Sequence, residues 1–166
     1  MITIQDDLIE RSVHVHWPDG FDPEHADLFA HNAIVIDAPV ESIWATLIAA
    51  AEWPRWYSNA GDVVVNDPSG RLGEDVTFNW TTFGLAIASR VGQFVPCSRL
   101  AWYGDGDQLR AYHSWLLIPR SGNSTYVVME EIGMGQGAQH LAQTNPGHMH
   151  RGHDLWNISL KFVCEA

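Results

Sequence analysis

One histidine of the sequence lies where a general base is expected. His113 falls within an alternating apolar segment that reads as a strand, and a hairpin closing at Arg120 and Asn123 places it directly opposite Glu130. A carboxylate beside an imidazole orients the ring and raises its basicity. We therefore predict His113 and Glu130 as a candidate catalytic pair, with a purely structural cross-strand pair as the alternative. Glu131 has the opposite parity and is expected to face the other way.

The histidines near the end of the chain do not suggest a metal site. On a helix, His148 and His150 point about 200° apart, so they cannot share one ion with His153. His150 and Asp154 are spaced i, i+4, but two ligands alone make a weak site. His153 lies beside an apolar helix stripe and is expected at the mouth of a cavity. We expect neither a metal nor a cofactor.

Eight tryptophans in 166 residues are a high content, and most fall on inward-facing positions. Core packing is one interpretation, because aromatic side chains dominate core energetics. Taken together they also suggest a cavity for flat or apolar ligands. The predicted ligand-binding residues are Trp56, Phe78, Trp80, Ile87, Trp102, Trp115, Val128, Met134, His153, Trp156 and Leu160.

A short strand, a helix and an aromatic corner must position these side chains first. Ile34–Ile36 is β-branched, and Pro39 follows at a position suited to a helix start. Apolar residues then recur with the one-faced helical period over Val40–Ala51. Pro54 disfavours helical geometry at Trp53 and so predicts a sharp corner that clamps the helix against a sheet.

The rest of the chain reads as sheet followed by one closing helix. The expected strands are 62–65, 76–81, 83–94, 100–103, 109–118 and 125–134, joined as antiparallel hairpins, which gives six or seven strands in all. Gly133–Gly137 is expected to be a strand end and hinge. The last helix runs from after Gly147 to about Cys164. Two adjacent apolar stripes predict that its neighbours embrace it broadly.

The segment IVIDAPVESIWATLIAAAEWPRWYSNA resembles the opening of the SRPBCC superfamily, the START and Bet v 1-like helix-grip proteins of the polyketide cyclase/dehydrase type. The resemblance implies an α+β helix-grip fold, in which a curved antiparallel sheet of six to seven strands wraps around a long C-terminal helix, with two short helices after the first core strand. It covers residues 33–166 as a single domain. Residues 1–32 are an N-terminal extension, in which Ser12–Trp17 is predicted to add an edge strand.

Composition narrows the class of partner. The net charge of −11 would repel nucleic acid and anionic membranes. Cys97 and Cys164 show no paired spacing, and no segment resembles a secretory signal or a membrane span. We expect a cytoplasmic protein whose partner is a small hydrophobic or aromatic ligand, without nucleic acid and without membrane insertion; a homodimer is left open.

Three functions remain open at this stage. The first is a protein that binds a small apolar or aromatic molecule between the sheet and the C-terminal helix. The second, implied by the resemblance, is a polyketide cyclase/dehydratase-like lyase that uses His113 as base and Glu130 as its orienting group. The third is a protein-interaction module, similar to co-chaperone domains, that uses its outer surface. The fold hosts all three kinds of protein, so fold alone does not choose between them.

Overall fold

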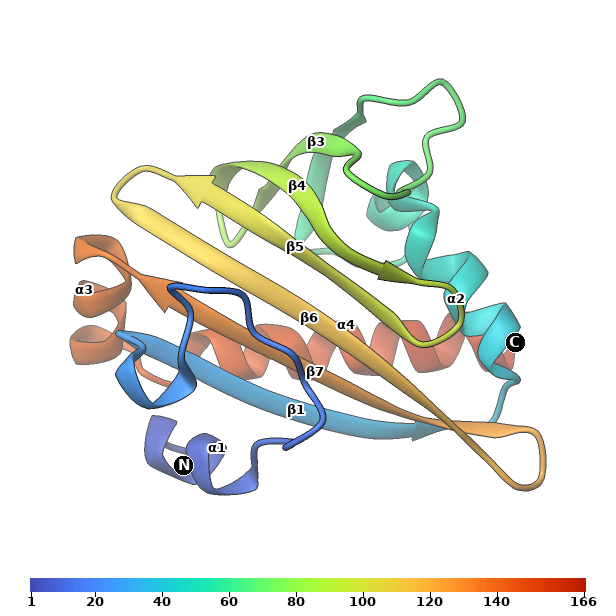
Figure 1. Cartoon of the computed structure of the whole chain (residues 1–166), viewed down its shortest axis with the longest axis horizontal. Helices are drawn as coiled ribbons and strands as arrows, with labels where there is room; N and C mark the ends of the chain where they lie inside the picture. Colours follow the sequence, from blue (N-terminus) through green and yellow to red (C-terminus); the bar gives the residue numbers. More distant parts are fainter.

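The computed structural model describes residues 1–166 and contains one seven-stranded antiparallel sheet (Figure 1). The strands lie in the order β1-β7-β6-β5-β4-β3-β2. Their bounds are β1 Leu28–Ile36, β2 Ala60–Val65, β3 Thr77–Thr82, β4 Leu85–Val95, β5 Arg99–Gly106, β6 Leu109–Arg120 and β7 Ser124–Met134. The α-helices are α1 Ile4–Glu10, α2 Val40–Ile48, α3 Gln136–Thr144 and α4 His148–Glu165, and the 3₁₀ helices are η1 Pro23–His25 and η2 Ala50–Arg55.

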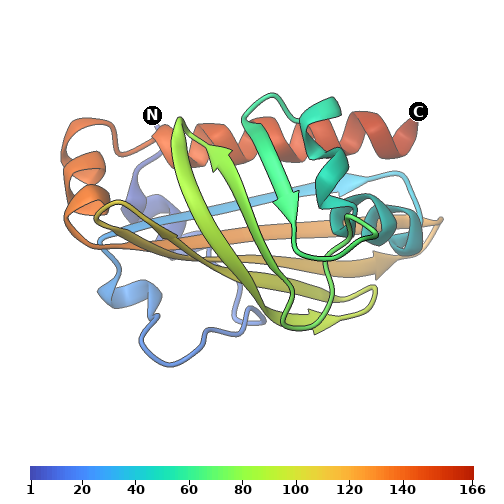
Figure 2. The same cartoon turned by 90° about the horizontal axis from the view of Figure 1, so that it is seen from above.

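The curved sheet carries α4 along one face (Figure 2). The main hydrophobic core lies between that face, α2, η2 and α4. At its centre the indole of Trp53 contacts the rings of Phe78, Trp80, Trp102 and Trp156. The predicted α+β helix-grip architecture is confirmed.

The helix and corner after β1 form as predicted. Pro39 is the N-cap of α2, and Ile43 and Leu47 are fully buried on its inner face. The corner in η2 is fixed from inside, because the indole Nε1 of Trp53 donates a hydrogen bond to the Leu47 carbonyl at 3.0 Å. This bond joins the end of α2 to the aromatic centre of the core.

The N-terminal extension differs from the prediction. Ser12–Trp17 forms no strand, and β1 begins at Leu28, so the predicted boundary at residue 33 falls inside β1. Helix α1 lies beside β1 and α4, and the rest of the extension crosses the face of the sheet opposite α4 (Figure 2), where Phe21 packs against Tyr112. Tertiary packing on that convex face takes the place of strand pairing.

The C-terminal third differs in two respects. The predicted glycine hinge leads directly into α3, a helix whose residues are mostly polar. The α4 helix is not embraced on all sides, because Leu155, Ile158 and Phe162 are exposed and only the stripe containing Met149, Trp156 and Leu160 is buried. No helix in the chain is both long enough and apolar enough to cross a membrane.

Candidate functional site

Three successive rows of side chains across β5, β6 and β7 determine where the interior is filled and where it is open. Residues paired directly across an antiparallel sheet point to the same face, so each row presents its side chains toward α4 together. Large side chains fill the first row, a histidine and a carboxylate occupy the second, and small residues form the third. The rows are Leu100/Trp115/Met129, Trp102/His113/Glu131 and Gly104/Ala111/Gly133.

The row of small residues opens a cavity of about 330 Å³ between the sheet, α3 and α4. This volume is at the lower end of the range of small-molecule sites, roughly 300–1,000 Å³. The cavity wall is mainly apolar. It includes Leu28, Trp80, Phe83, Leu85, Ile87, Trp102, Leu109, Ala111, Ala138, Leu141, Met149 and Trp156.

A polar cluster of three side chains from β6, β7 and α4 lies in this apolar wall. Nε2 of His153 is 3.0 Å from Oε1 of Glu131, and Nδ1 of His113 is 3.7 Å from Oε2 of the same carboxylate. His113 and His153 are almost completely buried, whereas the Glu131 side chain keeps 17 % of its surface exposed. The carboxylate therefore joins two buried imidazoles at the cavity wall.

The surroundings of the cluster set its charge. Burial lowers the pKa of His113, against the attraction of Glu131, so this imidazole is neutral near neutral pH. Burial alone would raise the pKa of Glu131, but its interactions with the two histidines outweigh burial and lower this pKa to about 2. A neutral imidazole beside an ionised carboxylate is able to accept a proton from a bound molecule.

Aromatic packing fixes the orientation of His113. Its ring stacks on the indole of Trp102 with centroids 4.6 Å apart and planes 7° apart, and the indole of Trp156 lies 5.2 Å away. The far ring nitrogens, Nε2 of His113 and Nδ1 of His153, are buried and have no hydrogen-bond partner. Packing and the Glu131 carboxylate, rather than further polar contacts, hold the two rings.

The predicted His113–Glu130 pair is wrong by one residue. The β6–β7 turn has a three-residue loop, Ser121–Asn123, so Arg120 pairs with Ser124 and His113 pairs with Glu131. Gly122 and Asn123 both adopt positive φ, 76° and 59°, which suits this longer loop. A shift of one residue moves every side chain of the strand to the other face.

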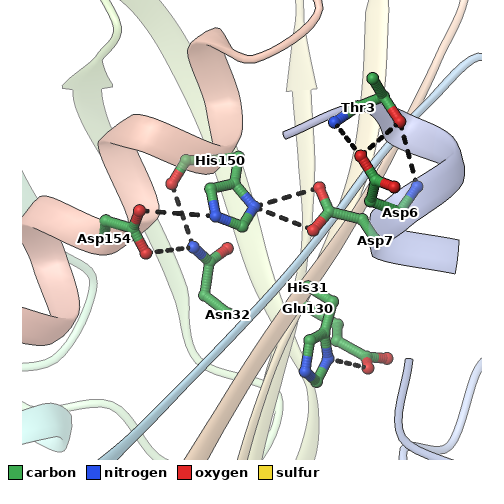
Figure 3. Close-up of polar contacts among 8 residues, drawn as sticks. All are labelled: Thr3, Asp6, Asp7, His31, Asn32, Glu130, His150 and Asp154. Carbon is green, nitrogen blue, oxygen red and sulfur yellow. Dashed lines mark hydrogen bonds and ion pairs between the residues drawn. The ribbon is translucent and has the colours of Figure 1, made fainter. Parts of the chain in front are cut away.

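Glu130 therefore lies on the convex face, and Figure 3 shows its carboxylate beside the ring of His31. Its Oε1 accepts a hydrogen bond from the backbone N–H of Ser12 at 2.6 Å and lies 2.7 Å from Nδ1 of His31. Glu130 is completely buried. This carboxylate fastens the extension to the sheet and does not reach the cavity.

The other predicted ligand-binding residues divide into three groups. Trp80, Ile87, Trp102, His153 and Trp156 line the cavity. Phe78, Trp115 and Leu160 are buried in the main core beside it, and Trp56 packs against that core while remaining partly buried. Val128 and Met134 face the convex side, because the register slip that misplaced Glu130 also misplaced them.

Several cavity residues escaped sequence reasoning. Phe83 is one of them: it lies in the β3–β4 turn, with φ of 51°, and its ring meets the ring of His148. Gly152 leaves room for that ring, since a Cβ there would lie 2.3 Å from Cε1 of Phe83. The positive φ of the following Gly84 (73°) belongs to a two-residue hairpin turn. The Phe-Gly dipeptide is the only local signal for this turn.

The histidines of α4 point in different directions, as their spacing predicts, and Figure 3 shows His150 directed toward α1. His150 points to the N-terminal extension, where Nδ1 is 2.9 Å from Oδ1 of Asp7, and its Nε2 is 3.4 Å from Oδ2 of Asp154. His153 points into the cavity. It meets His113 and Glu131, and one potential ligand atom from each of these three residues lies within 4.8 Å of the other two. Sequence spacing within α4 could not reveal this set, because its members come from three elements.

Comparison with known proteins gives the fold. Neither a protein-family model nor a curated protein matches the sequence. A crystal structure of a hypothetical protein from Helicobacter pylori is similar, with TM-score 0.84 and 26 % identity, covering 93 % of this chain and 98 % of that one. A START superfamily protein from Mycobacterium smegmatis has TM-score 0.65 and 12 % identity, with 82 % and 97 % covered. The chain has the helix-grip fold of the SRPBCC superfamily.

A third helix-grip structure is the Zhui aromatase/cyclase from a Streptomyces species. It has TM-score 0.69 and 10 % identity, and the match covers 82 % of this chain and 93 % of that one. At such identities the likeness extends to the SRPBCC fold alone. The features of this chain that bear on function are the cavity and its three polar side chains.

Proposed function

We propose that this protein binds a small, flat, largely apolar molecule in the cavity between the sheet and α4. The observation that carries the proposal is the cavity of about 330 Å³, whose apolar wall contains one buried polar cluster. Apolar walls with a few convergent polar groups are typical of small-molecule sites. Trp80, Trp102 and Trp156 favour an aromatic ligand, because their rings offer stacking and edge contacts.

The polar cluster defines the orientation of the ligand. A hydroxyl group on the ligand would meet His113, Glu131 and His153, while the ring system occupies the space beside Ala111 and Gly133. A ligand without such a group would leave the carboxylate desolvated and unpaired on its cavity side, which is unfavourable. We therefore expect aromatic ligands with one oxygen substituent to bind more tightly than plain hydrocarbons.

An enzyme that transfers a proton within the cavity is the second candidate. The neutral His113 imidazole lies 3.7 Å from the ionised Glu131, and shortening of this separation when a substrate binds would give a general base with its orienting group. A cyclase/dehydratase-type reaction on a polyketide-like substrate would use such a base. Glu131 takes the place that the sequence had given to Glu130. The third candidate, an interaction module, has less support, because the interior is open rather than packed solid.

Binding is tested with 2-naphthol, which has two fused rings and one hydroxyl group. Quenching of tryptophan fluorescence should give a saturable curve with one site. The variant Ala111→Trp fills the cavity and should abolish quenching, with folding verified by circular dichroism. The matched control is Tyr112→Phe, the next residue on the opposite face of β6, which should bind like wild type. No saturable quenching in wild type, or equal quenching in Ala111→Trp, would overturn the binding proposal.

Substitutions in the polar cluster distinguish an enzyme from a binding protein. For an enzyme, His113→Ala and Glu131→Gln should each slow turnover of a polyketide-like aromatic substrate by about 10²–10⁴, while affinity changes only a few fold. For a binder, the same substitutions change affinity and nothing else. Turnover that survives both substitutions would exclude the catalytic role of this pair.

A further inference from the structure

Two imidazoles and one carboxylate converge at the cavity wall. They belong to His113 of β6, Glu131 of β7 and His153 of α4, and one donor atom from each lies within 4.8 Å of the other two. Two histidines and one carboxylate form a ligand set used for catalytic zinc and for non-heme iron(II). Clusters of exposed acidic groups are common on protein surfaces, but here two of the three members are buried histidines that offer nitrogen ligands.

The distances within the cluster suit a shared ion. Ligand atoms bound to one tetrahedral ion at about 2.0–2.1 Å are about 3.3 Å from each other. The two separations from the Glu131 carboxylate, 3.0 Å from Oε1 to Nε2 of His153 and 3.7 Å from Oε2 to Nδ1 of His113, lie on either side of this value. The longer separation exceeds a hydrogen bond. An ion bound by both His113 and Glu131 would supply the direct link that this separation lacks.

The protein holds these ligands on rigid elements. His113 and Glu131 are direct cross-strand partners in the middle of the sheet, and His153 comes from the first half of the buried stripe of α4. Stacking on Trp102 fixes the ring of His113. Sites built on helices and strands keep their ligands in place more accurately than sites on loops.

The charge and the openness of the site also favour a cation. No lysine or arginine forms an ion pair with Glu131, whose ion-pair partners are the two histidines. All three side chains line the cavity, so three protein ligands would leave further coordination positions facing it. This is the arrangement of a catalytic metal site rather than a closed structural one.

We propose that His113, Glu131 and His153 bind one divalent transition-metal ion whose open coordination positions face the cavity. An oxygen atom of the cavity ligand would complete the coordination shell of this ion. Only this last statement rests on the proposed function; the metal site itself does not. Zinc and iron(II) share this ligand chemistry, and the experiment distinguishes them.

The test uses the full-length protein without an affinity tag, first stripped with EDTA. Co²⁺ serves as a spectroscopic probe, and Zn²⁺ and anaerobic Fe²⁺ are titrated separately by calorimetry. We expect one equivalent of Co²⁺ with visible absorption bands. Because Zn²⁺ generally binds more tightly than Fe²⁺ to the same ligands, the metal content of the protein before it is stripped, and not the relative affinity, identifies the native ion. Glu131→Gln and His153→Ala should each weaken binding by about 100-fold or more. Glu130→Gln is the matched control, because the adjacent carboxylate lies on the other face of β7, and it should bind as wild type does.

A measurement on wild type alone guards against variants that fail to fold. Bound Co²⁺ should shift or broaden the indole N–H signals of Trp102 and Trp156, which lie beside His113, and leave that of Trp17 on the convex face unchanged. Absence of stoichiometric binding, or binding that leaves the two cavity indoles unaffected, would overturn the metal site. Binding of 2-naphthol in EDTA is measured separately, so a failed metal site and a failed ligand cavity give different results.

Discussion

Glu130 and Glu131 are consecutive residues of β7, and their carboxylates lie on opposite faces of the sheet. Glu131 faces the cavity and contacts His113 and His153, whereas Glu130 faces the N-terminal extension and contacts Ser12 and His31. The two adjacent carboxylates thus have different roles: Glu131 belongs to the candidate site, and Glu130 holds the N-terminal extension. Substitutions at Glu130 and Glu131 are therefore one position apart in the sequence but affect opposite faces of the sheet.

The first prediction concerns Glu130. In Glu130→Gln the charge that accepts from Ser12 N–H and contacts His31 is lost, and we expect a loss of about 1–3 kcal/mol in the free energy of unfolding. Trypsin cleavage at Arg11 should become faster, because the extension is held less firmly. Binding of 2-naphthol should stay within a few fold of wild type. Resistance to trypsin equal to that of wild type would show that this carboxylate does not fasten the extension.

The second prediction concerns pH and α1. The hydrogen bond that His150 donates to the Asp7 carboxylate, together with the charges of Asp7 and Asp154, raises the pKa of His150 despite burial and the nearby Arg151. Because the pKa of His150 is higher in the folded than in the unfolded protein, its protonated form stabilises the fold. This stabilisation is complete below the unfolded-state pKa of about 6.5 and is lost as the pH rises through the folded-state pKa. Asp7→Asn should therefore lower the melting temperature more at pH 5.5 than at pH 9. An equal effect at both values would contradict the pairing.

The third prediction concerns Phe83 and Gly152. In Gly152→Ala the new methyl group would lie 2.3 Å from the Phe83 ring, which must move. We expect a loss of about 1–3 kcal/mol, typical of overpacking, measured by urea unfolding. The double variant with Phe83→Ala should recover most of the loss caused by Gly152→Ala, which a double-mutant cycle would report as coupling. Strictly additive effects would show that the two residues do not pack against each other.

The sequence predicted those parts of the fold that local patterns determine. The helical period after Pro39 and the proline at position 54 defined α2 and η2, and strand alternation with turn residues identified most of the sheet. The helix α3 escaped prediction, because its residues are mostly polar and a glycine precedes it. The outer apolar stripe of α4 was predicted to be covered by neighbouring elements but is exposed. Periodicity shows that an apolar stripe exists, but not whether another element covers it.

The candidate site was predicted only in part, for a related reason. His113 was found from its own strand, and His153 from its place on the last helix. Both histidines contact Glu131 only because of the register between β6 and β7. One residue more or less in the connecting loop changes this register. The cavity itself depends on Gly104, Ala111 and Gly133, which come from three strands and form one row only after pairing.

The most direct test of the account is a nuclear magnetic resonance titration of wild type with 2-naphthol, following the indole N–H signals. The cavity predicts that the signals of Trp80, Trp102 and Trp156 move together and saturate at one equivalent. Those of Trp17, on the convex face, and Trp44, on α2, should remain in place. Shifts confined to Trp17 or Trp44, or no saturable shift of the three cavity indoles, would contradict a ligand site between the sheet and α4.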